Sequence, residues 1–231
     1  MNNQVEGHSH HISHQFNVEL EDVKTHMLEM GGMVEKQLSD ALESIIQLDS
    51  EVAQRVRKDD TEIDKTEMVI DGECSRILAR RQPAASDLRL ILSIVKTIRD
   101  LERIGDESSK IAKMAIRLSE EGGLGKGFTG IRQIGDRVGK MVHSALDAFA
   151  RYDVKTARKV MEEDEDVDID YGIATGEMIR LMMEEPSNIS SVLNIVWAVR
   201  ALERIGDHAK NISEHVLYLV EGTDVRHGGL V

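Results

Sequence analysis

The sequence has few of the residues that mark several common classes of protein. Of its 231 residues, one is cysteine, two are proline and 3% are aromatic. A single cysteine, Cys74, cannot form a disulfide within the chain, which fits a reducing compartment. Strands are enriched in aromatic side chains, so this composition argues against an all-β sandwich or barrel.

Basic charge and long apolar runs are also scarce. The formal net charge is −13, which argues against nucleic-acid binding, because nucleic acids are held by clustered Lys and Arg and by aromatic stacking. No apolar run approaches the ~18 residues of a membrane span. The opening MNNQVEGHSHHISH lacks the basic and apolar regions of a signal peptide. We therefore expect a cytoplasmic protein that reaches a membrane only through partners.

The residues that dominate favour helix, and they occur in two copies. Ala, Leu, Ile, Met, Glu, Lys and Arg are mostly good helix formers, so we expect an all-α protein. The hexapeptide LERIGD stands at 101–106 and again at 202–207, an offset of 101 residues (202 − 101). Upstream, Asp49 matches Asp153 at an offset of 104 (153 − 49). The difference falls around Pro83 and Pro186, where a loop tolerates deletion. The chain is a tandem duplication.

Each copy predicts three long amphipathic helices, so that the fold is two elongated three-helix bundles with six long helices in all. Apolar residues recur every three or four positions, for example in the last helix at Leu202, Ile205, Ala209, Ile212, Val216 and Leu219. Asp49 or Ser50 can cap the second helix, and Ser86 or Asp87 the third. The glycine-rich EEGGLGKGFTG separates the copies. The predicted parts are a flexible N-terminus 1–15, bundles 16–120 and 131–222, a linker 121–130 and a tail 223–231.

Acidic residues fall level with one another across each predicted hairpin. In the first copy, one pair lies 19 residues on either side of Pro83 (83 − 64 and 102 − 83), and a second pair lies 23 away on either side. Antiparallel helices of equal rise place such pairs side by side. Each half therefore stacks four carboxylates: Asp60, Asp64, Glu102 and Asp106 in the first, and Asp164, Asp168, Glu203 and Asp207 in the second.

Two interpretations of these carboxylates stay open. Four close carboxylates repel one another unless they bind protons or a cation, and oxygen-only clusters suit Mg, Mn, Fe or Ca. The glycines inside the motif, Gly105 and Gly206, are unfavourable within a helix, which suggests close approach or room for a ligand. Alternatively, the acids form ordinary surface ion pairs with neighbouring arginines: Arg99, Arg103, Arg200 and Arg204.

Signals of catalysis are missing. A di-iron helical bundle uses Glu-x-x-His pairs, and the sequence contains none. We therefore expect no enzyme, and a metal-dependent enzyme or metal-storage bundle that uses the carboxylate clusters is the alternative.

Several stretches together resemble one family. QFNVELEDV, MGGMVEKQLSDAL, RRQPAASDLR, DLERIGDESSKIA and ALERIGDHAKNISEHV are similar to sequences of the PhoU family, over residues ~10–228. The resemblance implies two three-helix bundles, a homodimer, and negative regulation of the phosphate-starvation response and of phosphate uptake. It also implies two partners, the sensor kinase PhoR and the Pst phosphate transporter through its ATPase subunit PstB.

Some family members carry metal clusters on E(D)xxxD motifs, which correspond here to Glu102/Asp106 and Glu203/Asp207. The expected ion is divalent or trivalent: Mg, Mn, Fe, Zn or Ni. The second motif is followed by Asn211 where the first has Lys110. A lysine beside Asp106 would weaken the first site, so we expect the second half to hold metal better.

Overall fold

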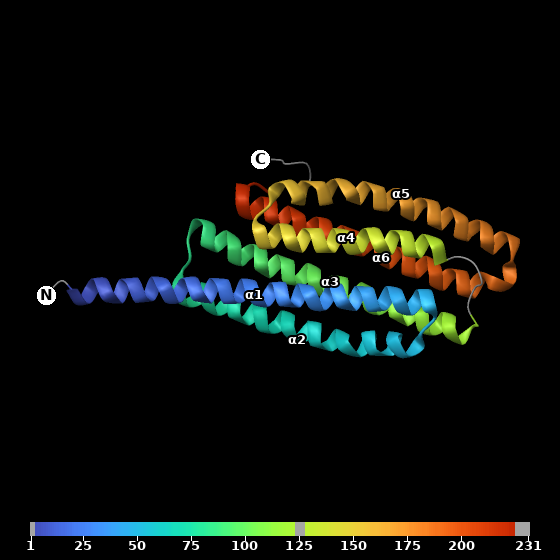
Figure 1. The fold of residues 1–231 in the computed structure, drawn as a ribbon, viewed down its shortest axis with the longest axis horizontal. Helices are drawn as coiled ribbons and strands as arrows, with labels where there is room; N and C mark the ends of the chain where they lie inside the picture. The colour runs from blue at the N-terminus through green and yellow to red at the C-terminus, as the bar shows by residue number, and fades with distance from the viewer. Residues whose placement is uncertain (1–2, 123–127, 225–231) are drawn as a thin grey trace.

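The computed structural model describes residues 3–122 and 128–224, without the side chains of 3–13 and 128–129. Within these residues the chain forms six long α-helices and no strand, which confirms the all-α duplication (Figure 1). The elements are α1 (Asn3–Gln47), α2 (Ser50–Arg81), α3 (Ala85–Glu120), α4 (Phe128–Arg151), α5 (Val154–Glu184), the 3-10 turn η1 (Pro186–Asn188) and α6 (Ile189–Glu221).

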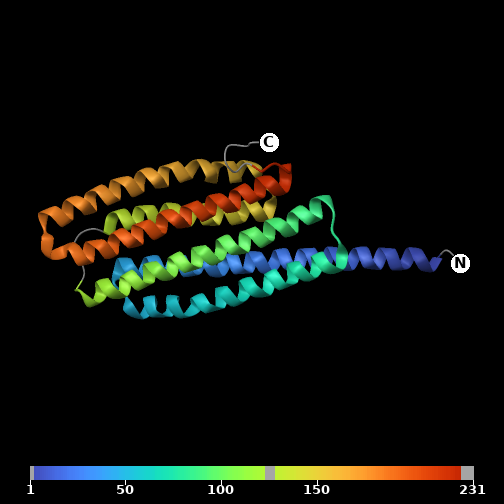
Figure 2. The same cartoon turned by 180° about the vertical axis from the view of Figure 1, so that it is seen from behind.

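The six helices lie nearly parallel in an elongated body. Helices α1–α3 form one bundle and α4–α6 the other, and the two bundles meet most extensively between α3 and α6. Helices α1 and α4 lie on the side toward the viewer in Figure 1, and α3 and α6 face the viewer in Figure 2. Helices α2 and α5 are the outermost of the six. The motif-bearing helices α3 and α6 therefore occupy the middle of one broad face.

Equivalent turns in the two bundles have the same local chemistry. The Asp49 side chain accepts hydrogen bonds from the Glu51 and Val52 amides, and Asp153 does the same for Lys155 and Thr156. The residues before these caps, Leu48 and Tyr152, are left-handed, with φ of 57° and 58°. An N-terminal carboxylate satisfies amides that lack a partner within the helix. The predicted cap at Asp49 is confirmed.

The third helix starts differently from our expectation. It begins at Ala85 with Ala84 as its N-cap and no side-chain cap hydrogen bond. The prediction of a Ser86 or Asp87 cap was therefore wrong, because both residues already lie inside the first turn.

Two glycines allow the halves to cross closely at α1 and α4. A Cβ on Gly135 would lie 2.5 Å from Leu42 Cδ2, and a Cβ on Gly31 would lie 2.8 Å from Leu146 Cδ2. The pairs are reciprocal, because Gly31 matches Gly135 and Leu42 matches Leu146 at the repeat offset of 104. Each leucine fills the space that the missing side chain leaves on the other half.

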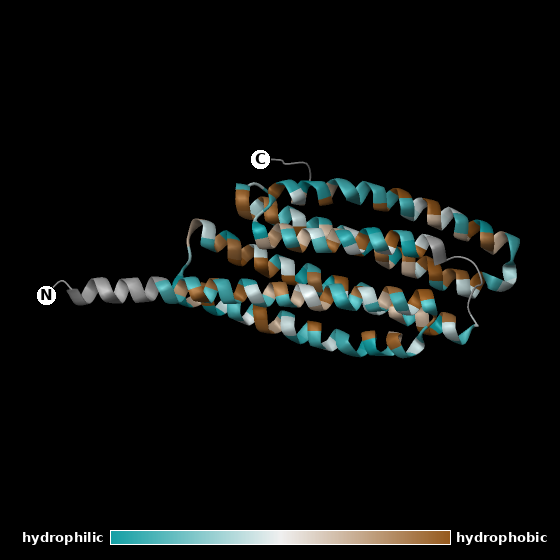
Figure 3. Cartoon of the chain, in the orientation of Figure 1, coloured by the Kyte–Doolittle hydropathy of each residue, from teal (hydrophilic) through white to brown (hydrophobic). Residues whose placement is uncertain are grey.

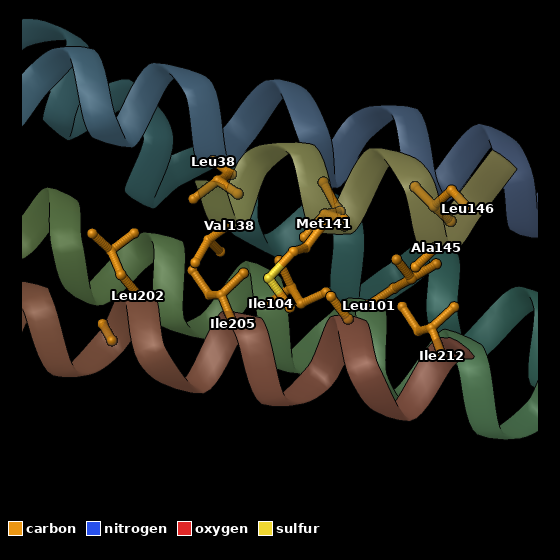
Figure 4. Packing of buried hydrophobic residues seen from close by; sticks show 14 of the residues in the cluster. Leu38, Leu101, Ile104, Val138, Met141, Ala145, Leu146, Leu202, Ile205 and Ile212 are labelled. Carbon is orange, nitrogen blue, oxygen red and sulfur yellow. The ribbon is translucent and has the colours of Figure 1, made fainter. Parts of the chain in front are cut away.

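The core is continuous across both bundles. Figure 4 shows Leu38 and Leu101 of the first bundle packed with Met141, Val138 and Ile205 of the second. Polar residues cover the outer turns of α2 and α5, drawn in teal in Figure 3. The predicted stripe of the last helix is buried throughout: Leu202, Ile205, Ala209, Ile212, Val216 and Leu219.

The remaining cysteine belongs to this core. Cys74 is fully buried and reduced, and burial raises the pKa of its thiol to about 12. The thiolate, which is the reactive form, is therefore not populated at neutral pH.

The boundaries of the bundles differ in detail from the predicted ones. Helix α1 begins at Asn3, so the described backbone of the stretch 1–15 is helical, and its flexibility stays a prediction. Residues 123–127 of the linker and 225–231 of the tail lie outside the described residues. Helix α6 ends at Glu221, followed by Gly222 in the left-handed region at φ 74°. Among the helices described, none is long and apolar enough to cross a membrane.

Candidate functional site

The first LERIGD motif faces helix α2, and the four predicted acids of this half come together there. Burial raises the pKa of Glu102 above its usual value, and the charges of Asp106 and Asp64 raise it further. Burial also raises the pKa of Asp60, and the same two charges add to the rise, against hydrogen bonds from neighbouring side chains. The acids that the hairpin predicts to lie level, Glu102 with Asp64 and Asp60 with Asp106, therefore repel one another between α3 and α2.

The second motif faces α5 in the same way. Burial raises the pKa of Glu203, and the charges of Asp207 and Asp168 add to the rise. Burial and then the charges of Asp164 and Asp168 raise the pKa of Asp207. Asp164 is the buried member, only 4% exposed. Each half therefore has a cluster of four acids: a first cluster (Asp60, Asp64, Glu102, Asp106) and a second cluster (Asp164, Asp168, Glu203, Asp207).

Basic side chains neutralise the two clusters differently. In the first cluster, Arg103 contacts Asp106 at 3.0 Å and Glu102 at 3.3 Å from the exposed surface. In the second cluster, Lys210 Nζ lies 2.7 Å from Asp164 Oδ2. The equivalent arginine, Arg204, contacts Glu107 instead. The predicted arginine ion pair is therefore present in the first cluster, through Arg103, whereas the ion pair of the second cluster is made by Lys210, which that interpretation did not include.

Our reason for preferring the second half was wrong. Lys110 does not approach Asp106; its Nζ lies 2.9 Å from Glu107 Oε1. Asn211 does not face the second cluster either, because it donates to Asp100 on α3. The lysine that does enter a cluster is Lys210, in the half that we expected to be free of one.

One buried oxygen without a hydrogen-bond partner lies beside the first cluster. Gln37 of α1 donates from Nε2 to Asp60 Oδ1 at 2.9 Å, while its Oε1 is buried and has no hydrogen-bond partner. A Cβ on Gly105 would lie 3.1 Å from that Oε1 and 3.3 Å from Asp60 Oδ1. The donor set, carboxylates plus one unpaired amide oxygen, fits a hard cation. No three His, Cys, Asp or Glu side chains of the described residues are already placed to hold one, so binding would require them to turn inward.

A further polar cluster joins the two bundles, and sequence reasoning missed it. Asp100 of α3 accepts hydrogen bonds from His208 Nδ1 at 2.8 Å, Asn211 Nδ2 at 3.1 Å and His215 Nε2 at 2.9 Å. Burial alone would raise the pKa of Asp100, but the hydrogen bonds from the two histidines hold it at about 2. The available signal was the spacing of the three donors along one face of α6.

Comparison with known proteins places the fold and both motifs in one family. The model of the PhoU domain matches residues 27–115 and again 131–216. A Pseudomonas aeruginosa protein named phosphate-specific transport system accessory protein PhoU homolog is 60% identical, over 96% of this chain and 92% of the relative. The Escherichia coli phosphate-specific transport system accessory protein PhoU is 43% identical, over 95% of this chain and 90% of its own length.

Solved structures agree with the sequences. The crystal structure of PhoU from Pseudomonas aeruginosa superposes with a TM-score of 0.88 and 59% identity, over 90% of this chain and all (100%) of the other. A phosphate transport system regulatory protein PhoU from Streptococcus pneumoniae gives a TM-score of 0.85 at 31% identity, over 91% of this chain and 99% of the other. The two repeated bundles with their LERIGD motifs are two PhoU domains, and the chain belongs to the PhoU family.

Proposed function

We propose that the protein is an accessory regulator of phosphate-specific transport, which restrains phosphate uptake and holds the phosphate-starvation response off when phosphate is plentiful. The observation that carries this is the match of the PhoU domain to both repeats. Relatives that cover nearly the whole chain are named as accessory proteins of this transport system. The proposed partners are the sensor kinase PhoR and the ATPase subunit PstB of the transporter.

A role exerted through contact agrees with the surface of the second bundle. The outer part of the α5–α6 hairpin exposes an unusual number of large apolar side chains, among them the single tryptophan: Ile169, Ile173, Ile179, Met183, Ile189, Leu193 and Trp197. Exposed apolar groups that gather on one region mark interaction surfaces, and tryptophan is frequent among residues that dominate binding energy. We infer a protein that binds other proteins, including a second copy of itself, and that is not an enzyme.

Metal binding is the second part of the proposal. The ligands would come from the two acid clusters, with Mg, Mn, Fe, Zn or Ni as candidate ions. A bound cation would supply positive charge that removes the carboxylate repulsion and ties α2 to α3, or α5 to α6. Each hairpin brings the acids onto facing helices, and their carboxylates would turn inward to hold the ion.

The location follows from the partners. We place the protein in the cytoplasm, with any attachment to the membrane made through the two proposed partners. Membrane fractions from cells that lack both partners should contain none of it.

Deleting the gene tests the regulatory function. A reporter of the phosphate-starvation response should switch on in phosphate-rich medium in the deletion strain and switch off again when the chain is restored. A reporter that stays silent in the deletion strain contradicts the proposal. Restoring the chain with Glu102→Gln and Asp106→Asn tests whether regulation depends on metal binding: a reporter that switches off again shows that regulation does not need those charges.

A further inference from the structure

The backbone of Gly105 leaves a small space in the first bundle that is lined by two oxygens and by Ile63 Cδ1 at 3.4 Å. The two nearest atoms to its missing Cβ are Gln37 Oε1 and Asp60 Oδ1, at 3.1 and 3.3 Å. Gln37 is 5% exposed, so water reaches its unpaired Oε1 poorly. A buried acceptor without a donor is unfavourable. This space therefore favours a positively charged or proton-donating group.

The corresponding space in the second bundle lacks the amide oxygen and already has a cation beside it. A Cβ on Gly206 would meet Val167 Cγ1 at 3.5 Å, Asp164 Oδ1 at 3.7 Å and Met141 Cε at 3.9 Å, and Met141 takes the place of Gln37. Met141 lies among the core side chains in Figure 4. Lys210 takes the place of Ser109 and places its ammonium on the buried Asp164, at 2.7 Å.

The two cations differ in how easily a metal ion could displace them. The side chain of Arg103 is 58% exposed, and its partner carboxylates are both partly exposed. Such surface pairs are weak. Lys210 binds a carboxylate whose side chain is 6% exposed, and taking its ammonium away would leave that charge buried and unpaired, which is strongly unfavourable.

We propose that the two clusters are unequal cation sites. The first binds a divalent metal ion, with Gln37 Oε1 as a neutral ligand beside Asp60. In the second, the ammonium of Lys210 takes the role of the metal ion. This rests on the metal-binding part of the proposed function and reverses the preference for the second half that the sequence alone suggested.

Exchanging the distinguishing side chains between the halves tests this. The full-length chain is freed of metal with a chelator and titrated with Mn²⁺, which prefers oxygen ligands, while bound ions are counted by equilibrium dialysis and elemental analysis. Wild type should bind about one Mn²⁺ per chain tightly. Ser109→Lys, which gives the first cluster the lysine of the second, should weaken that binding at least tenfold, and Gln37→Met should weaken it severalfold.

The reverse exchange should open the second site. Lys210→Ser together with Met141→Gln should raise the count to two. Lys210→Gln, which keeps a polar side chain, is the backup variant if the double change fails to fold by circular dichroism. Lys110→Ser is the matched control, since Lys110 contacts Glu107 outside both clusters, and it should bind like wild type.

Three outcomes overturn the proposal: two equal sites in wild type, no change in the count when Lys210 is replaced, or no Mn²⁺ bound by wild type. If wild type binds one Mn²⁺, the variant Glu102→Gln with Asp106→Asn should bind none. If that variant still binds one ion, the ion lies outside the first cluster and the proposal is wrong. None of these binding results predicts the phenotype of the deletion strain. The regulatory function is therefore tested separately, by the reporter in that strain.

Discussion

The two bundles carry an identical hexapeptide on the same kind of hairpin, yet the groups around the equivalent aspartates Asp60 and Asp164 differ. Asp60 is surrounded by an amide and a hydroxyl, from Gln37 and Ser109. Asp164 has an ammonium beside it, and Met141 takes the place of Gln37 at the glycine. A motif fixes where its own side chains lie, whereas the neighbouring helices decide which chemistry those side chains meet. Duplicated motifs should therefore not be assigned duplicated functions without their surroundings.

The contact between the halves is similarly unequal. Asp100 of α3 lies against three donors of α6, while its counterpart in the second half is Ala201. One half supplies the carboxylate and the other the donors. The duplication has thus become a pair of complementary surfaces.

The largest effect should come from breaking this one-sided contact. Asp100→Ala leaves three donors, of which His215 is buried and two are partly buried, without their acceptor, and we expect it to lower the free energy of unfolding by about 3 kcal/mol. Urea unfolding at pH 7 measures the loss. The exposed Asp59→Ala is the control and should change stability by less than about 0.5 kcal/mol. An equal loss of stability in both variants would contradict the role of Asp100 as the acceptor that joins the two bundles.

The same contact should depend on pH. The folded pKa of Asp100 is about 2, below the unfolded value of about 3.9. Its stabilisation is therefore fully present above about pH 4 and is lost as pH falls toward 2. The difference in stability between wild type and Asp100→Asn should shrink over that window. A constant difference from pH 7 to 3 would show that charge is not involved.

The two lysines provide the next comparison. Lys210→Met leaves Asp164 without a partner, so in chelator we expect a loss of about 2 kcal/mol. Lys110→Met should cost less than about 1 kcal/mol, because Glu107 keeps its contact with Arg204. Urea titrations of both variants in chelator measure the two losses in the free energy of unfolding. A larger effect at Lys110 would reverse the ranking of the two clusters.

Glycines at the crossing of α1 and α4 should be intolerant where their neighbours are not. Gly135→Ala places a Cβ 2.5 Å from Leu42, and forcing the leucine aside should cost about 1–2 kcal/mol. Gly139→Ala meets nothing within 4 Å and should gain up to about 1 kcal/mol from helix propensity. Thermal unfolding of the two variants should therefore shift in opposite directions, and a shared direction would contradict close packing at this crossing.

Alanine at the two LERIGD glycines, Gly105 and Gly206, should also affect stability unequally, but by less than at the crossing of α1 and α4. Gly206→Ala finds ordinary contact distances of 3.5 Å or more, so we expect stabilisation by roughly 0.5–1 kcal/mol. Gly105→Ala must displace an oxygen at 3.1 Å, which should cancel that gain. Unfolding midpoints in chelator measure both, and equal gains would remove the argument for a special space in the first half.

The smallest expected effect concerns charge in the second cluster without metal. Burial raises the pKa of both Glu203 and Asp207, so their charged forms are unfavourable in the folded state. Glu203→Gln with Asp207→Asn should stabilise the chelated protein slightly at pH 7. The gain should vanish as pH falls through the folded pKa values, where wild type binds the protons itself. Destabilisation at pH 7 would indicate partners for these acids.

The sequence predicted the features that depend on local pattern. The repeat, the helical stripes, the cap at Asp49 and the level pairing of the acids all follow from spacing along one helix or one hairpin. The sequence did not predict which residue a side chain contacts when candidate partners lie on different helices. Lys110 and Asn211 occupy equivalent positions, yet one meets Glu107 and the other Asp100. These choices arise only when two bundles pack against each other, and an alignment of the repeats does not contain that packing.

The seam between α3 and α6 also changes what the linker does. The halves have an extensive apolar contact, a partly buried carboxylate shared across it, and the reciprocal leucine–glycine crossing on the other side. They are therefore held together by these surfaces rather than by the peptide that joins them. The linker mainly raises the effective concentration of one half near the other. A protease cut there should leave a two-piece protein that migrates as one particle, so that the chain behaves as a heterodimer whose subunits are encoded in tandem.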